Sequence, residues 1–109
     1  MHKYKIEYSK ESKKDLIEIK KYIKNDLQEP ETAQKLIDKI RKQINELKDN
    51  PEIYAIIDED IIKKLEIRKL IIDNYIVFYI PNKNKKIVTV IRVLYGGRNI
   101  DNQLNFHTK

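Results

Sequence analysis

Five basic or phenolic side chains are the strongest candidates for chemistry in this sequence: Arg68, Lys69, Arg92, Tyr95 and Arg98. Guanidinium groups bind phosphate oxygens in a bidentate manner, so several together would hold a nucleic-acid backbone or stabilise a phosphoryl-transfer transition state. A phenol beside two arginines could move a proton, although its ordinary pKa of about 10 makes it a weak base. Arg98, Tyr95 and Arg68 are therefore candidate catalytic residues if the protein is a nuclease.

A structural role for two of these arginines is the alternative. Arg68 and Arg92 can lie on one sheet face if they occupy the outer strands of a meander, and the apolar neighbours Ile91 and Val93 leave either face open for Arg92. A charged residue within an apolar strand is unfavourable unless it is paired. The spacing alone favours ion pairs between these arginines and helix carboxylates.

The net charge of +6 is concentrated in one third of the chain. Residues 63–98 contain nine Lys or Arg and two acidic residues, whereas residues 1–62 contain 13 basic and 14 acidic residues. This asymmetry is typical of a protein with a nucleic-acid or acidic protein partner, and a solvated lysine-rich surface is the alternative. The candidate target-binding residues are Lys69, Arg92, Arg98, Lys83, Lys85 and Lys86.

We expect no metal and no small-molecule cofactor. The chain has no cysteine, and its two histidines, His2 and His107, stand at opposite ends without carboxylates at ligand spacing. The pair Gly96-Gly97 lacks the surrounding pattern of a phosphate-binding loop. The acidic run Asp58-Glu59-Asp60 is more typical of a solvated surface than of an acid–base pair.

Length and hydropathy predict one domain, residues 1–109, in the cytoplasm. The first residues alternate in charge, unlike a secretory signal peptide. The longest apolar run, residues 75–80, is far shorter than the roughly 20 residues that span a bilayer, so we expect no membrane partner. The absence of cysteine is compatible with a reducing compartment.

Hydrophobic periodicity predicts an α+β fold with the order β-α-α-β-β-β. Residues 4–8 alternate as a strand does. Apolar stripes over residues 16–27 and 33–47 predict two helices, the first capped by Ser9 or Ser12. A short link at Pro30 would make them an antiparallel hairpin.

The second half of the chain predicts a sheet. Residues 65–72, 75–80 and 87–94 are rich in β-branched and aromatic residues, with turn-forming segments between them. We expect an antiparallel three-stranded meander that packs against the helical hairpin, with the N-terminal strand at one edge. Residues 51–62 are expected to form a loop.

These elements resemble the RelE/ParE toxin superfamily of type II toxin–antitoxin systems over residues 4–104. The matching pieces are Tyr4-Lys5-Ile6-Glu7-Tyr8-Ser9, Asp15-Leu16 with Ile19 and Tyr22-Ile23, Pro30 with Ala33, Ile44 with Leu47 and Pro51, Ile67-Arg68-Lys69-Leu70 with Asp73-Asn74-Tyr75 and Val77-Phe78-Tyr79, and Val90 with Arg92-Val93-Leu94-Tyr95-Gly96-Gly97-Arg98-Asn99-Ile100. The resemblance implies a toxin that a cognate antitoxin binds and silences. RelE-like members are metal-independent endonucleases that cut mRNA on the ribosome, and ParE-like members inhibit DNA gyrase.

The resemblance also assigns individual residues. Arg98 matches the arginine that RelE-like nucleases use to stabilise the scissile phosphate, and Lys69 falls near a basic position of that site. Ile76 and Leu104 stand where those nucleases carry a catalytic arginine and a functional tyrosine, which leaves Tyr95 as the only substitute.

The segment Val93-Leu94-Tyr95-Gly96-Gly97-Arg98, together with Asn74-Tyr75, is more similar to the ParE branch. We therefore expect a gyrase inhibitor and not an enzyme. A RelE-like ribosome-dependent mRNA endonuclease and a non-toxic binding relative are the alternatives.

Overall fold

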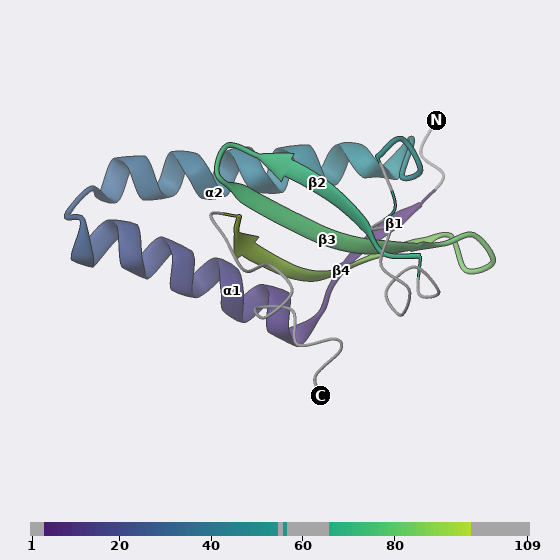
Figure 1. The fold of residues 1–109 in the computed structure, drawn as a ribbon, viewed down its shortest axis with the longest axis horizontal. Helices are drawn as coiled ribbons and strands as arrows, with labels where there is room; N and C mark the ends of the chain where they lie inside the picture. The colour runs from purple at the N-terminus through teal and green to yellow at the C-terminus, as the bar shows by residue number, and fades with distance from the viewer. Residues whose placement is uncertain (1–3, 55, 57–65, 97–109) are drawn as a thin grey trace.

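The α+β fold class and the element order are confirmed. A computed structural model describes residues 4–54, 56 and 66–96, and Figure 1 shows the arrangement of its elements. Strand β1 (Lys5–Tyr8) is followed by helices α1 (Lys10–Lys21) and α2 (Pro30–Asn45) and then by strands β2 (Arg68–Ile72), β3 (Tyr75–Asn82) and β4 (Ile87–Tyr95). None of the helices among the described residues is long and apolar enough to cross a lipid bilayer.

The start of α1 is fixed by Ser9. Its Oγ accepts a hydrogen bond of 3.0 Å from the backbone N–H of Ser12, which satisfies one of the free donors at the helix N-terminus. Ser12, the other candidate cap, lies inside the helix, and its Oγ donates to the Ser9 carbonyl at 2.9 Å. The pair therefore closes the first turn from both sides.

The two helices form the predicted hairpin. After α1 the chain passes through one π-helical turn, Tyr22–Asp26, and then reverses direction at Gln28, which adopts the left-handed conformation with φ 55°. Pro30 then occupies the first turn of α2, where its missing N–H is not needed. A short 3₁₀ turn, Glu46–Lys48, follows α2.

The sheet has the order β1-β4-β3-β2. Strands β2, β3 and β4 form the predicted antiparallel meander, and β1 joins β4 at the edge in parallel orientation. The strand predicted over residues 65–72 begins at Arg68. Of the loop predicted over residues 51–62, residues 51–54 form turns and bends and Ile56 makes an isolated bridge with Arg68, while residues 55 and 57–62 lie outside the described residues.

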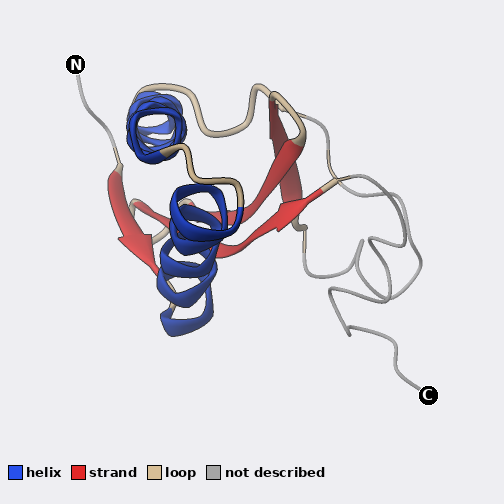
Figure 2. Ribbon diagram, turned by 90° about the vertical axis from the view of Figure 1, so that its left-hand side faces the viewer, coloured by secondary structure: helices blue, strands red, loops and turns tan. Residues whose placement is uncertain are grey.

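Two apolar clusters lie on opposite faces of the sheet. Both helices cover one face, as Figure 2 shows, and there Ile40 and Ile44 of α2 pack against Val77, Tyr79 and Val90. All five are fully or almost fully buried. The opposite face carries a smaller cluster made of Ile67, Phe78 and Leu94, against which Ile76, Ile80 and Ile91 pack. The helix-facing cluster is the main core.

Candidate functional site

The predicted site residues are spread along the sheet. Tyr95 ends β4 and pairs with Tyr75, whereas Arg68 begins β2 and pairs with Tyr79. On β2, Tyr75 pairs with Ile72, which lies four residues beyond Arg68. Tyr95 and Arg68 are therefore about 13 Å apart in the direction of the strands. Arg98 lies outside the described residues. The structure therefore separates Tyr95 from Arg68, the two described members of the candidate catalytic group.

Arg68 binds the loop that follows α2. One of its terminal nitrogens, Nη1, donates to the Tyr54 carbonyl at 2.7 Å and to the Glu52 carbonyl at 3.3 Å. Its cross-strand partner, Tyr79, is fully buried, and the Tyr79 hydroxyl donates to the Pro51 carbonyl at 2.7 Å. The expected ion pair between Arg68 and a helix carboxylate is therefore wrong: this arginine binds backbone carbonyls because β2 begins beside the loop.

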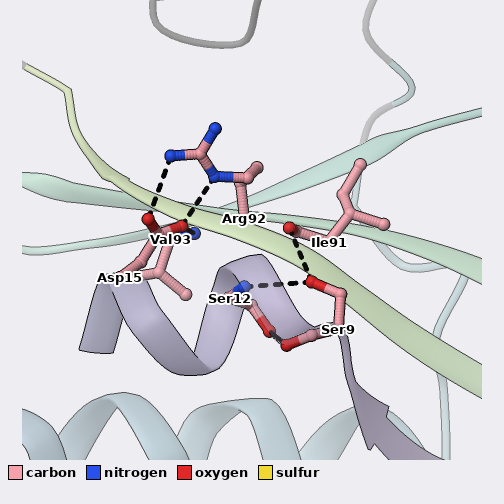
Figure 3. Close-up of polar contacts among 6 residues, drawn as sticks. All are labelled: Ser9, Ser12, Asp15, Ile91, Arg92 and Val93. Carbon is pink, nitrogen blue, oxygen red and sulfur yellow. Dashed lines mark hydrogen bonds and ion pairs between the residues drawn. The ribbon is translucent and has the colours of Figure 1, made fainter. Parts of the chain in front are cut away.

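Arg92 forms the ion pair that the sequence analysis favoured. Its Nε donates to Asp15 Oδ2 at 2.8 Å and its Nη2 donates to Asp15 Oδ1 at 2.9 Å, a bidentate contact with α1 (Figure 3). These hydrogen bonds raise the pKa of the Arg92 guanidinium above its ordinary value, and burial acts in the opposite direction. Arg92 thus fastens β4 to α1.

The same part of α1 completes the edge of β4. Strand β1 ends at Tyr8, and beyond it the Ser9 N–H donates to the Val90 carbonyl at 2.8 Å. The Ser9 hydroxyl then donates to the Ile91 carbonyl at 2.9 Å, and Asp15 Oδ2 accepts the Val93 N–H at 2.9 Å (Figure 3). Two side chains therefore take the place of an edge partner for backbone groups that would otherwise be buried without one.

Arg68 and Arg92 do not share a sheet face, which corrects the expectation above. Arg68 pairs with Tyr79, and Arg92 pairs with Phe78, whose side chain lies in the opposite apolar cluster. An extra residue, Ile91, interrupts the register of β4 opposite Phe78 and Tyr79. A bulge of this kind inverts the alternation beyond it.

Lys69 is the basic residue that does share a face with Arg92. Both pair with Phe78, from β2 and from β4, so their positions lie on the face away from the helices, and the Arg92 guanidinium reaches back to Asp15 of α1. The distance between their strands is about two strand spacings, or roughly 10 Å. Lys69 and Arg92 are thus two predicted target-binding residues that lie at the same level across the sheet.

Lys83, Lys85 and Lys86 lie in the turn between β3 and β4, at the opposite end of β4 from Tyr95 (Figure 1). Lys83 Nζ contacts Glu52 at 3.0 Å, and Lys86 Nζ lies 5.3 Å from the ring centroid of Tyr4. The structure therefore places these lysines away from the other candidates. Among the residues it describes, no group of three or more His, Asp or Glu could hold a metal ion.

A groove of about 660 Å³ lies between α1 and the end of β4, at the Tyr95 end of the sheet. Tyr22, Leu27 and Tyr95 line it with side chains that are 53%, 48% and 54% exposed. The ring of Tyr75 meets that of Tyr95 edge to face, with centroids 5.7 Å apart. Burial, together with the neighbouring Tyr95 and Tyr22, raises the pKa of the Tyr75 phenol.

Tyr22 and Leu27 could not be singled out from the sequence, because both continue the apolar stripe of the first helix. In the structure both are about half exposed, Tyr22 as the first residue of the π-helical turn and Leu27 as its C-cap. The available signal for their exposure was their place at the end of the apolar stripe, just before the link between the two helices.

Comparison with known proteins places the chain in a family. No curated protein sequence matches it. The structure is similar to one in the chromosomal ParDE toxin–antitoxin system from P. aeruginosa, with a TM-score of 0.70 and 18% identity, covering 87% of this chain and 98% of that one. It is also similar to a free double mutant of the E. coli toxin RelE, with a TM-score of 0.63 and 16% identity, covering 89% and 86% of the two chains.

At these identities the solved structures establish the fold alone. The family model that describes the ParE toxin of the parDE type II toxin–antitoxin system matches residues 6–100. That range includes all the helices and strands described above except Lys5, the first residue of β1. The chain therefore belongs to the ParE toxin family within the RelE/ParE superfamily.

Proposed function

We propose that the protein is the toxin of a type II toxin–antitoxin pair, and that it arrests growth in the cytoplasm by inhibiting DNA gyrase. The match of residues 6–100 to the ParE toxin family carries this proposal. A cognate antitoxin, in the manner of a parDE system, would bind and silence it.

The contacts of the basic residues favour inhibition over RNA cleavage. Arg68 is engaged by loop carbonyls and Arg92 by Asp15, so neither guanidinium is presented as a nuclease would need it. Ile76, which stands where RelE-like nucleases carry a catalytic arginine, packs against Gly96. A Cβ at Gly96 would lie 2.9 Å from Ile76 Cδ1, which makes this contact close.

The two activities can be separated with the purified protein. We expect it to inhibit supercoiling by gyrase and to leave mRNA intact with or without ribosomes. On induction, replication should stall and the DNA-damage response should appear before translation falls. Ribosome-dependent mRNA cleavage that yields 2′,3′-cyclic phosphate ends, and that Arg98→Ala abolishes, would contradict the gyrase proposal and favour the nuclease.

We further propose that the antitoxin occupies the groove between α1 and β4. Exposed apolar side chains gathered around one groove are typical of an interaction site, and Tyr22, Leu27 and Tyr95 make such a patch. Tyrosine is enriched among residues that dominate interface energies. An amphipathic antitoxin segment with an apolar face is the partner that this lining favours.

Replacing Tyr22 and Leu27 with alanine should weaken antitoxin binding at least about tenfold, because two apolar anchors would be removed. The matched control is the double variant Ile17→Ala and Ile71→Ala, since both side chains are 60% exposed and lie outside the groove. Titration calorimetry with the product of the adjacent gene measures both. Equal losses in the two variants would mean that the antitoxin binds elsewhere.

A further inference from the structure

A second groove, of about 890 Å³, lies between the edge strand β1 and the C-terminal half of α2. Four cationic side chains line it, Lys5, Arg41, Lys42 and Lys48, against one carboxylate, Asp38, which gives a net charge of +3. Asp38 already accepts a hydrogen bond from Gln34 at 2.8 Å. The groove is therefore a site of positive potential.

Its charge comes from the acidic half of the sequence. Residues 1–62 carry a net charge of −1, yet folding gathers cations from β1, α2 and the following turn on one side. Lys86 joins them, because the Lys5 N–H donates to the Lys86 carbonyl at 2.8 Å and so places the β3–β4 turn beside the start of β1. A turn lysine predicted to bind the target thus adjoins this groove.

Two tyrosines hold cations at the groove. The Arg41 guanidinium lies 5.9 Å from the ring centroid of Tyr8, and Lys86 Nζ lies 5.3 Å from that of Tyr4. Such cation–π contacts restrict long side chains before a ligand arrives, which lowers the entropy lost on binding. Burial raises the pKa of the Tyr8 phenol although Arg41 opposes it, so Tyr8 adds no negative charge at neutral pH.

The backbone of β1 adds hydrogen-bond donors. Lys5 and Ser9 direct their N–H groups to β4, so the intervening Ile6 and Tyr8 have theirs on the other side of the strand. Both residues line the groove, and β1 has no second strand partner among the described residues. N–H groups that point away from the neighbouring strand can donate to water or to a ligand acceptor.

We propose that this groove binds the sugar–phosphate backbone of a single-stranded nucleic acid. A concave cationic groove with aromatic rings between the cations is typical of proteins that hold single strands without reading their sequence. The Arg41 guanidinium provides bidentate contacts to phosphate oxygens, and the lysines provide point charges. This site is separate from the antitoxin groove and does not depend on the identity of the toxin's target.

The test is fluorescence anisotropy with a labelled oligothymidylate of about 12 nucleotides and the full-length protein. Affinity should fall linearly with salt on logarithmic axes, by about 0.7 per phosphate contacted. The double variant Arg41→Gln and Lys42→Gln should weaken binding about tenfold and reduce that slope by about 1.4, since two contacts are lost. Lys5→Gln with Lys48→Gln serves as a second groove variant if the first unfolds.

The matched control is Lys21→Gln with Lys24→Gln, which removes the same charge from exposed positions at the far end of the helical hairpin (Figure 1). It should change the affinity less than about threefold, because charges more than a Debye length away from the groove are screened by salt. Three results would each overturn the proposal: no binding at low salt, equal losses in control and groove variants, or equal affinity for polyglutamate, which would indicate an acidic peptide site.

Discussion

Replacing Asp15 with alanine should lower the free energy of unfolding by about 3 kcal/mol. The Asp15 side chain is 9% exposed and accepts three hydrogen bonds, two from Arg92 and one from the Val93 N–H. Its removal would leave a guanidinium and a backbone donor without their partner, which is more harmful than the absence of the whole pair. Arg92 is 26% exposed and can recover some hydration, which keeps the loss at the lower end of the range for buried pairs.

Urea unfolding measures this loss, and two variants serve as controls. Asp15→Asn retains one acceptor and should lose about half as much. Glu18→Ala removes an exposed carboxylate from the same helix and should change the free energy by less than about 0.5 kcal/mol. If Asp15→Ala were no worse than Glu18→Ala, the link between α1 and β4 would contribute little to stability.

Tyr79→Phe should lower stability at neutral pH by about 1–2 kcal/mol and make it less sensitive to alkali. The hydroxyl is buried in the core and donates to the Pro51 carbonyl, which would be left without that donor. Burial raises the pKa of the Tyr79 phenol well above its ordinary value, and the charge of Arg68 opposes the increase only in part. The folded protein therefore keeps this proton at a pH at which the unfolded chain releases it.

Because the pKa of Tyr79 is higher in the folded than in the unfolded protein, stability falls as the pH rises. Below about pH 10, the ordinary pKa of tyrosine, the stability that the buried Tyr79 phenol contributes is fully present. Above that pH, Tyr79 alone should lower the free energy of unfolding by about 1.4 kcal/mol per pH unit until the folded phenol ionises. Thermal unfolding between about pH 8 and 11 should show a shallower decline for Tyr79→Phe. The exposed Tyr22→Phe should retain the wild-type slope. A parallel decline in all three proteins would exclude Tyr79 as its source.

The fold could be predicted because local pattern and tertiary packing agree. The apolar stripes that predicted two helices are the residues, such as Ile40 and Ile44, that contact the sheet. The β-branched runs became the meander, and Pro30 marks the start of α2 as expected. The parallel pairing of β1 with β4 was not predicted, because periodicity within a strand carries no information on its partner's direction.

The site was less predictable because it depends on register. A single extra residue at Ile91 decides which face carries Arg92, and no residue in that segment is a glycine or proline that would mark a bulge. Asp15 gave a better signal, since it adjoins Leu16 in the buried stripe of α1 while its neighbours Lys13 and Lys14 are exposed. An acid on an apolar helix face and an arginine in an apolar strand are natural partners.

Charge counted along the chain missed the groove beside β1. Lys5 is far in sequence from Arg41 and Lys48, and acidic residues lie between them, so the sum over residues 1–62 cancels their charges. Basic and acidic residues that are neighbours in the sequence lie on different sides of the folded protein, because successive residues of a helix face different directions. Only the packing of β1 against α2 reveals the cluster.

The contacts that Ser9 and Asp15 make with β4 also have a consequence for folding. Ser9 and Asp15 contact residues 77 to 82 positions later in the chain, so these contacts form only after β4 has been synthesised. Contacts of such long range slow folding, because a large loop must close before they form. A ribosome that stops before β4 releases a chain in which β1 has no strand to pair with. Synthesis that stops before β4 should therefore yield a chain that does not fold.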